Sequence, residues 1–454
     1  MHFLPPAEQL EATAVELLQS LIRLGSVNDG SAESGQEIRA TKLLEQFFAD
    51  ISGSLELTVL ESAPGRASLI ARLPGSHPNS RSLGLVGHLD VVSADATQWQ
   101  HDPFGAELVD SEIWGRGAVD MLFLTAIYAT LFREFARAAA KGQRLAGDLV
   151  FMGVADEEGG SNLGMKWLAE HHRELIRVDE VLTEAGGMRI GEHVAVSVAE
   201  KGSAGRRLHF TGRPGHGSAP YGSDNPIARI GEVVERVTGS GDERASIHPL
   251  WVQFVDAQIQ DAAVASQLTN PHTIDSALPE LGALAGYAHA ITRTSVTPTV
   301  VRAGKQHNMI PGSATIDLDI RPLPGTSADD VDRMLVQRLG SLAEAVRIER
   351  LFGWEASASP TDSGLYRTLE STISSVLGAE AVPIMAAGGS DARFFRYLGI
   401  EAYGFAMLSE EWSYERYRSR IHTHNERIDL ASISLTISAL SQIVSKRLQD
   451  EETQ

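Results

Sequence analysis

The chain contains no cysteine among its 454 residues. Disulfide bonds, a thiol nucleophile and thiolate ligation of a metal are therefore excluded, and any metal must be held by nitrogen and oxygen donors. Positive charge is also scarce, since 39 lysine and arginine residues stand against 59 aspartate and glutamate residues, which gives a formal net charge of −20. Binding of nucleic acid needs a basic face, so nucleic acid is not expected as a partner.

No apolar run is long enough to span a bilayer, so we expect no membrane partner. The first thirty residues also lack the basic start and unbroken apolar stretch of a targeting signal, because they carry Glu8, Glu11 and Glu16. We therefore expect a cytoplasmic protein. A hydrophobic content of 43% and a charged content of 22% are ordinary for a soluble globular protein, and the length favours two domains over one core.

The first two hundred residues alternate helical patterns with short apolar runs. Helices are predicted at 6–23, 36–49 and 125–140, and the apolar runs are typical of buried strands. Helices that alternate with apolar strands predict an α/β fold with a mixed, mostly parallel sheet flanked by helices. In such sheets, ligands bind beyond the carboxyl ends of the strands.

The character of the sequence changes near Gly202. Residues 205–215 and 313–322 alternate polar with apolar side chains, which indicates a sheet with one wetter face. Helical patterns at 226–237 and 328–339 could cover its other face. We therefore predict an inserted α+β domain.

The predicted domain boundaries follow from this change. The catalytic domain is expected in two parts, 1–201 and 356–454, with the inserted domain at 202–355. Residues 242–294 have a mixed pattern that predicts no definite element.

Imidazoles and carboxylates recur in the short connections after the apolar runs. They are His88 and Asp90 in LVGHLDVV, Asp120 in WGRGAVDM, Glu157 and Glu158 in VADEEGG, Glu184 in LTEAGG, and His422 and His424 in IHTHNERI. If the acids converge, their joint ionisation needs compensating charge, which two divalent cations would supply. Oxygen and imidazole donors suit zinc, with manganese or cobalt as replacements. Such a site makes a nucleophile from water, so the pattern predicts a hydrolase.

Each of these residues also has a simpler interpretation. Asp90 lies two positions after His88, so its carboxylate could accept the spare imidazole N–H, and a buried histidine without a metal would look the same. Asp120 could bridge two cations or cap the helix that follows it. Glu157 and Glu158 face opposite ways, so one could bind a cation while the other faces the substrate, or both could be solvated surface.

The ordered motifs GHLDVV, GRGAVDM, DEEGG, E-x-GG and IHxxNERI resemble those of the zinc-dependent family of aminoacylases, carboxypeptidases and succinyl-diaminopimelate desuccinylases, over essentially the whole chain. The resemblance implies two zinc ions per subunit bridged by Asp120. One ion would also be held by His88 and Glu184, and the other by Glu158 and His422.

The resemblance also assigns two residues beside the ligands. Glu157 would be the general base, and Asp90 would be the partner of the histidine ligand. Motif position favours His422 over His424. Met121 stands where many relatives carry lysine, a departure that bears on specificity and leaves the ligand set intact.

The family has a small lid domain, often used for dimerisation, which the inserted domain matches. His216 in GRPGHGSAP resembles a histidine that stabilises the oxyanion, in some members across a dimer. Asn308 in HNMIP and Arg321 in DIRPLPG resemble residues that hold the substrate carboxylate, which the planar fork of arginine suits. Gly389 and Ser390 in GGSDAR resemble a substrate-side loop. The alternatives are a surface loop for the histidine, a surface ion pair for the arginine, and a glycine turn with a helix cap for GGSDAR.

These features together predict a dizinc amidohydrolase that cleaves a peptide or N-acyl-amino-acid bond beside a free carboxylate. Glu184, where aminopeptidase-type relatives tend to carry aspartate, favours carboxypeptidase or acyl-amino-acid substrates. The alternatives are a dipeptidase that recognises the free amino end, and a non-catalytic metal-binding module for ligand recognition or assembly. The expected partners are a small peptide or N-acyl amino acid and a second copy of the chain in a homodimer.

Overall fold

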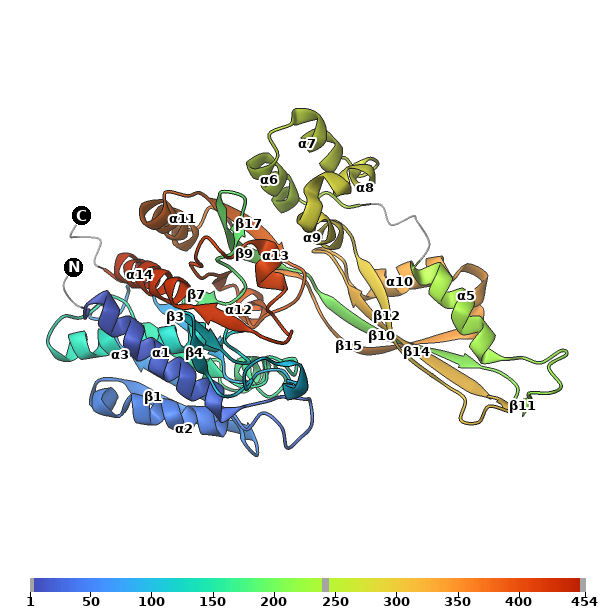
Figure 1. Cartoon of the computed structure of the whole chain (residues 1–454), viewed down its shortest axis with the longest axis horizontal. Coiled ribbons are helices and arrows are strands. Elements are labelled where there is room, and N and C mark those ends of the chain that lie inside the picture. The colour runs from blue at the N-terminus through green and yellow to red at the C-terminus, as the bar shows by residue number, and fades with distance from the viewer. Residues whose placement is uncertain (1–3, 239–244, 450–454) are drawn as a thin grey trace. The chain divides into compact units, whose positions relative to one another are not determined.

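The computed structural model describes residues 4–238 and 245–449, which form two compact units (Figure 1). Unit 1 comprises Met1–Val198, Ser359–Ile384 and Ser390–Gln454, and unit 2 comprises Ala199–Ala358 and Met385–Gly389. Among the described residues, no helix has both the length and the apolar character needed to cross a bilayer. The predicted role of the inserted domain as a lid or dimerisation domain stays a prediction.

Unit 1 is built on a mixed sheet. Its strands, in spatial order, are β1 (Glu56–Ala63), β2 (Arg66–Leu73), β6 (Leu149–Val154), β3 (Leu83–His88), β7 (Glu180–Thr183), β18 (Glu401–Gly404) and β9 (His193–Glu200). The central strands β6, β3, β7 and β18 are parallel, while β2 and β9 run against the others. The predicted mixed, mostly parallel sheet is confirmed.

Helices cover this sheet. On one side, α1 (Ala7–Leu24), α3 (Leu122–Ala140) and α14 (Leu430–Arg447) pack together, and α3 lies on β3 and β6. A second buried cluster joins the strands to α4 (Met165–His171) and α12 (Ala392–Tyr397). Every residue of β3 and β6 is buried, which explains why these strands read as continuous apolar runs.

The predicted helices of unit 1 are present with shifted ends. The helix predicted at 125–140 begins three residues earlier, at Leu122. The one predicted at 36–49 is α2 (Ile38–Phe47), followed by the 3-10 helix η1 (Ala49–Ser54). The remaining elements of unit 1 are η2 (Ala96–Gln98), β4 (Glu107–Val109), β5 (Glu112–Trp114), β8 (Arg189–Ile190), α11 (Gly364–Leu377), α13 (Tyr414–Arg418) and β19 (Arg427–Asp429). The strand β17 (Ala381–Ala386) runs from unit 1 into unit 2.

Unit 2 contains an antiparallel sheet of β12 (Ser295–Ala303), β14 (Ser313–Arg321), β10 (Ser203–Thr211) and β15 (Val346–Trp354). The helices α5 (Pro226–Thr238) and α10 (Ala328–Leu339) bury one face of it. The predicted alternation holds, since Ile316, Leu318 and Ile320 are all buried in this core. The other elements are β11 (Gly215–His216), β13 (Met309–Ile310), η4 (Gly340–Ala345) and β16 (Ser357–Ala358).

The stretch for which the sequence predicts no definite element forms short helices. They are α6 (Pro249–Gln258), α7 (Ala262–Leu268), α8 (Ile274–Ala277), η3 (Leu278–Leu284) and α9 (Ala285–Ile291), while residues 242–244 lie outside the described residues. Among these helices, the buried rings of Trp251 and Phe254 stack on each other, and Tyr287 packs against Phe254 at a tilt. Helices of four to ten residues are too short to establish a helical period in sequence, which explains the mixed pattern.

The segment after β7 approaches β18 at two glycines. A Cβ atom at Gly404 would lie 1.9 Å from the carbonyl oxygen of Glu184, and one at Gly186 would lie 2.1 Å from the carbonyl oxygen of Gly404. Only glycine permits this approach of two backbones. The two glycines therefore fix the main chain of Glu184 against the sheet.

We expect Gly404→Ala to lower the free energy of unfolding by about 1–3 kcal/mol, because the added methyl group meets main-chain atoms that have no room to move. Urea unfolding would measure the change. Gly53→Ala in η1 is the matched control, since no atom lies within 4 Å of a Cβ atom there. Equal stability of Gly404→Ala and the wild type would contradict the packing argument.

Candidate metal centre

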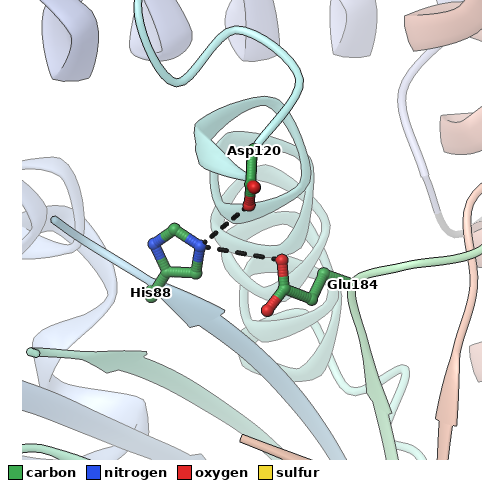
Figure 2. A group of neighbouring side chains, drawn as sticks. All are labelled: His88, Asp120 and Glu184. Atoms are coloured by element: carbon green, nitrogen blue, oxygen red, sulfur yellow. Dashed lines mark hydrogen bonds and ion pairs between the residues drawn. The ribbon is translucent and has the colours of Figure 1, made fainter. Parts of the chain in front are cut away.

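Three side chains meet where the parallel strands β3 and β7 end (Figure 2). His88 is the last residue of β3, Glu184 directly follows β7, and Asp120 lies just before α3. The Nε2 atom of His88 is 3.2 Å from Oδ1 of Asp120 and 3.7 Å from Oε2 of Glu184. The three donor atoms lie within 4.8 Å of one another and could hold a metal ion.

A second group shares Asp120. Its other oxygen, Oδ2, lies 3.2 Å from Nε2 of His422, and the same imidazole nitrogen is 3.1 Å from Oε2 of Glu158. These donors also lie within 4.8 Å of one another. Because Asp120 offers one oxygen to each group, it has the geometry of a carboxylate that bridges two cations.

The structure thus brings together all five residues that the family resemblance suggests as ligands. Each group offers one imidazole nitrogen and two carboxylate oxygens, a donor set that suits zinc and leaves a coordination position for water or substrate. The alternative of a helix cap for Asp120 is wrong, because α3 begins at Leu122 after Met121, without a capping side chain.

His88 is oriented by the main chain of Asp90. Its Nδ1 atom lies 2.8 Å from the carbonyl oxygen of Asp90, and 3.7 Å from the Oδ1 atom of the carboxylate. The sequence suggests the carboxylate as the acceptor, but the carbonyl oxygen takes that place. The carboxylate instead accepts the main-chain N–H groups of Glu157 at 3.2 Å and Glu158 at 3.1 Å. Asp90 therefore orients both the imidazole and the turn that carries the two acids.

Asp120 is held by a residue that the sequence analysis did not single out. Glu426 is fully buried, and its Oε1 atom accepts the main-chain N–H groups of Val119 at 2.7 Å and Asp120 at 3.0 Å. Its Oε2 atom accepts a hydrogen bond from Arg116 at 2.6 Å. Glu426 and Arg116 both stand inside the quoted motifs, but a sequence motif does not reveal hydrogen bonds to the main chain.

The carboxylates raise one another's pKa values in the metal-free protein. Burial, and then the charge of Asp120, raise the pKa of Glu184 to about 8. The same two causes raise the pKa of Glu158. Burial and the charge of Glu184 raise the pKa of Glu157 well above its usual range. The predicted repulsion among converging acids is therefore present in the fold.

The pKa values of the two histidines are also raised, which in their case favours the charged form. Hydrogen bonds to Asp120 and Glu158 raise the pKa of His422 to about 10. Burial alone would lower the pKa of His88, but hydrogen bonds to Asp120 and Glu184 raise it well above its usual range. Burial opposes ionisation of Asp120, yet its hydrogen bonds to both histidines lower its pKa. Two imidazolium groups thus balance part of the negative charge when metal is absent.

Tyr417 in α13 also belongs to this environment. Burial raises the pKa of its phenol well above the usual range, and the charges of Asp120 and Glu184 raise it further. The hydroxyl group therefore stays protonated close to the two carboxylates. No signal in the sequence separates this tyrosine from the other seven.

His216 is the last residue of the short strand β11, Asn308 directly precedes β13, and both residues are exposed. The main-chain N–H of Ser218 donates to Nδ1 of His216 at 3.2 Å, and the Ser218 hydroxyl lies 2.7 Å from the same atom. A main-chain N–H can only donate, so Nδ1 accepts and the neutral imidazole carries its proton on Nε2. The carbonyl oxygen of Asn308 accepts the N–H of Gly217 at 2.7 Å. Their roles toward a substrate stay predictions.

Arg321 forms an ion pair within β14. Its Nε and Nη2 atoms donate to the two carboxylate oxygens of Asp319 at 2.9 and 3.2 Å, and its guanidinium lies 5.8 Å from the ring centre of Trp354. The surface ion pair named as the alternative is therefore present. The predicted contact of Arg321 with a substrate carboxylate remains a prediction.

The GGSDAR segment begins α12. The hydroxyl of Ser390 accepts the main-chain N–H of Ala392, the first residue of α12, at 3.2 Å. Asp391 stands at the N-cap position and makes no side-chain cap hydrogen bond, so only the serine contact of the helix-cap alternative is present. Asp391 accepts a hydrogen bond from the Ser161 hydroxyl at 2.6 Å, and burial raises its pKa to about 6. The substrate roles of Gly389 and Ser390 stay predictions.

The sequence profile of peptidase family M20/M25/M40 matches residues 84–446. The chain belongs to this family. It is 25% identical to aminoacylase-1 of Homo sapiens over 389 residues, which cover 84% of each chain. Its fold is similar to that of the M20 family metallo-carboxypeptidase Sso-CP2 of Sulfolobus solfataricus, with a TM-score of 0.74, 18% identity and coverage of 96% of this chain and 98% of that one.

A second solved structure with this fold is human carnosine dipeptidase 1, with a TM-score of 0.73, 16% identity and coverage of 98% of this chain and 99% of that one. The predicted family is confirmed. The chain is a hydrolase of amide bonds from a metal-dependent family, which argues against the non-catalytic alternative.

Binding of a divalent metal should release protons, because His422 in particular must lose the proton that its pKa of about 10 retains at pH 7. We therefore expect the apparent affinity for zinc to rise between pH 6 and pH 8. Titration calorimetry in two buffers of different ionisation enthalpy would count at least one released proton. His424→Gln is the control and should release as many as the wild type; an affinity independent of pH would contradict the expectation.

Proposed function

We propose that the chain is a dizinc amidohydrolase that cleaves a peptide or N-acyl-amino-acid bond beside a free carboxylate. The observation that supports it is the position of Asp120, which gives one oxygen to each of two groups of donors. Two divalent cations bound there would lower the pKa of water toward neutrality and polarise the scissile carbonyl group.

Glu157 is the proposed general base. It is half-buried beside the ligand Glu158, and its main-chain N–H is fixed by Asp90. Burial and the charge of Glu184 make it a better proton acceptor than an ordinary glutamate. Glu157 would accept the proton of the attacking water and return it to the nitrogen of the leaving amine.

His216 is the proposed donor to the oxyanion. The hydrogen bond from Ser218 leaves the proton of the neutral imidazole on Nε2, which is the form able to donate. A fixed donor at the oxygen that gains charge stabilises the transition state more than the substrate.

The free carboxylate of the substrate is the proposed contact of Asn308, Arg321, Gly389 and Ser390. Aminoacylase-1 and the metallo-carboxypeptidase Sso-CP2 are named for substrates that present such a carboxylate beside the scissile bond. Arg321 donates to Asp319 through its Nε and Nη2 atoms, so its Nη1 group is the proposed donor to the substrate. A charged hydrogen bond from Nη1 would favour a carboxylate over an amide.

We expect Glu157→Gln to lower kcat by about 10²–10⁴-fold, because the amide cannot take the proton of the attacking water. Metal content, measured by plasma emission, should equal that of the wild type, since Glu157 is not in either group of donors. Glu170→Gln, an exposed site on α4, is the control and should leave kcat unchanged. Full turnover by Glu157→Gln would remove Glu157 from the mechanism.

The substrate class is tested with acetyl- and succinyl-amino acids, dipeptides and the carboxamide analogue of each, in the presence of zinc, manganese or cobalt. We expect turnover of compounds with a free carboxylate. Arg321→Ala should raise KM for the substrates with a free carboxylate by roughly 10-fold or more, because one charged hydrogen bond is lost. The KM for the carboxamides should change little.

Arg302→Ala is the matched control, because Arg302 also pairs with an aspartate, Asp317, on the same sheet. An Arg321→Ala profile identical to that of Arg302→Ala would refute the role of Arg321. A requirement for a free amino group in place of the carboxylate would establish the dipeptidase alternative.

A further inference from the structure

The turn that carries Glu157 and Glu158 has an uncommon backbone. Asp156 has a φ of +66°, Gly160 of +97° and Ser161 of +65°. Residues other than glycine adopt positive φ values rarely, and only where their surroundings hold them. The conformation of this turn must therefore be maintained by contacts around it.

One set of contacts comes from Asn28. Its Nδ2 group donates to Oδ2 of Asp90 at 2.8 Å and to Oδ1 of Asp156 at 3.0 Å. Asp90 in turn accepts the main-chain N–H groups of Glu157 and Glu158. The amide of Asn28 thus links Asp156, at the start of the turn, to Asp90, which binds the main chain of the turn.

A second set comes from Arg66 at the start of β2. Its Nε and Nη2 atoms donate to both carboxylate oxygens of Glu37, at 2.8 and 2.7 Å, and Nη2 also donates to Oδ1 of Asp156 at 2.9 Å. Glu37 accepts the main-chain N–H of Asp156 at 3.2 Å. The remaining oxygen of Asp156 accepts the N–H of Leu163 at 2.8 Å, beyond the turn.

All members of this network are buried. The exposed fractions are 5% for Asn28, 0% for Glu37, 2% for Arg66, 0% for Asp90 and 5% for Asp156. Buried charges persist in proteins when they are paired and hydrogen-bonded. Arg66 supplies the positive charge for two of these carboxylates, so it holds Glu37 and Asp156 in one arrangement.

The network lies directly against the turn. A Cβ atom at Gly159 would be 2.3 Å from Oδ1 of Asp156 and 2.7 Å from Nδ2 of Asn28. Arg66 and Glu37 belong to neither group of possible metal ligands, and hydrogen bonds of their side chains join them to each other and to Asp156. A shift of Arg66 would therefore reach the acids through the backbone of the turn.

We propose that Arg66, together with Glu37 and Asn28, positions the Glu157 carboxylate relative to the donor group of Asp120, Glu158 and His422. This inference rests on the proposed function, in which Glu157 accepts the proton. Arg66 acts through Asp156 and does not touch the reacting atoms. Misplacement of a catalytic group by about 1 Å is enough to lower a rate about 100-fold, so the network bears on turnover.

The test compares Arg66→Met with Arg72→Met. Both arginines stand on β2, and Arg72 also binds a carboxylate, that of Asp148 at 2.8 Å, together with the carbonyl oxygens of Leu175 and Arg177. We expect Arg66→Met to lower kcat about 10–100-fold, with KM within about threefold of the wild type and metal content unchanged. Arg72→Met should keep kcat within about twofold.

A readout independent of activity accompanies the kinetics. Hydrogen exchange of the peptide that spans Asp156 to Leu163 should be at least about tenfold faster in Arg66→Met than in the wild type, because the contacts that hold the turn are gone. Arg72→Met should leave this peptide unchanged. Arg66→Lys keeps the positive charge but replaces the planar guanidinium with a flexible ammonium group. It should recover part of the kcat that Arg66→Met loses.

The proposal is overturned if folded Arg66→Met keeps the kcat and the exchange rate of the wild type, or if Arg72→Met reduces kcat equally. Should Arg66→Met fail to fold, Asn28→Ala and the double variant Glu37→Gln/Arg66→Met, which leaves no buried glutamate charge unpaired, are judged by the same two readouts. If the wild-type enzyme cleaves no substrate of the panel, the proposed function fails, while the exchange rates still decide whether the network holds the turn.

Discussion

Repulsion between carboxylates at one edge of the sheet is the constraint on which the rest of unit 1 depends. Asp120, Glu158 and Glu184 meet there because β6 and β7 are parallel and end on the same side, and because Asp120 lies just before α3, which packs on β3 and β6. Burial and mutual charge raise the pKa values of the two glutamates, so all three acids can be ionised together only at the cost of repulsion that nearby positive charge must offset. His88 and His422 supply part of it, and the donor geometry suits two cations for the rest.

The acids are held in this arrangement mainly by other carboxylates that accept main-chain N–H groups. Asp90 fixes the turn of Glu157 and Glu158, and Glu426 fixes the backbone of Asp120. A carboxylate that accepts two main-chain donors is a rigid support, because neither donor can rotate away. The side chains able to ligate a metal therefore project from backbone that is itself fixed, which is the condition for a preorganised site.

The sequence could predict the sheet and the strand ends, because apolar runs that stop at a histidine or an acid are a local signal. It could not predict that the carbonyl oxygen of Asp90 would orient His88, since its carboxylate is equally close along the chain. The sequence could not predict the roles of Glu426 and Arg66 for a related reason. Their partners Asp120 and Asp156 lie 306 and 90 residues away along the chain, respectively. The sequence could favour His422 over His424 only through the family motif, because no periodicity relates either histidine to Glu158, which lies 264 residues before His422.

These distances along the chain have a consequence for stability. The two groups of donors come from five separate segments, at residues 88, 120, 158, 184 and 422, so an unfolded chain cannot present them together. A cation that binds them binds the folded state and stabilises it by its own binding free energy. The repulsion between the acids, once a cation compensates it, thus links metal binding to folding. Glu157 lies outside both groups, so its protonation is free to serve the reaction.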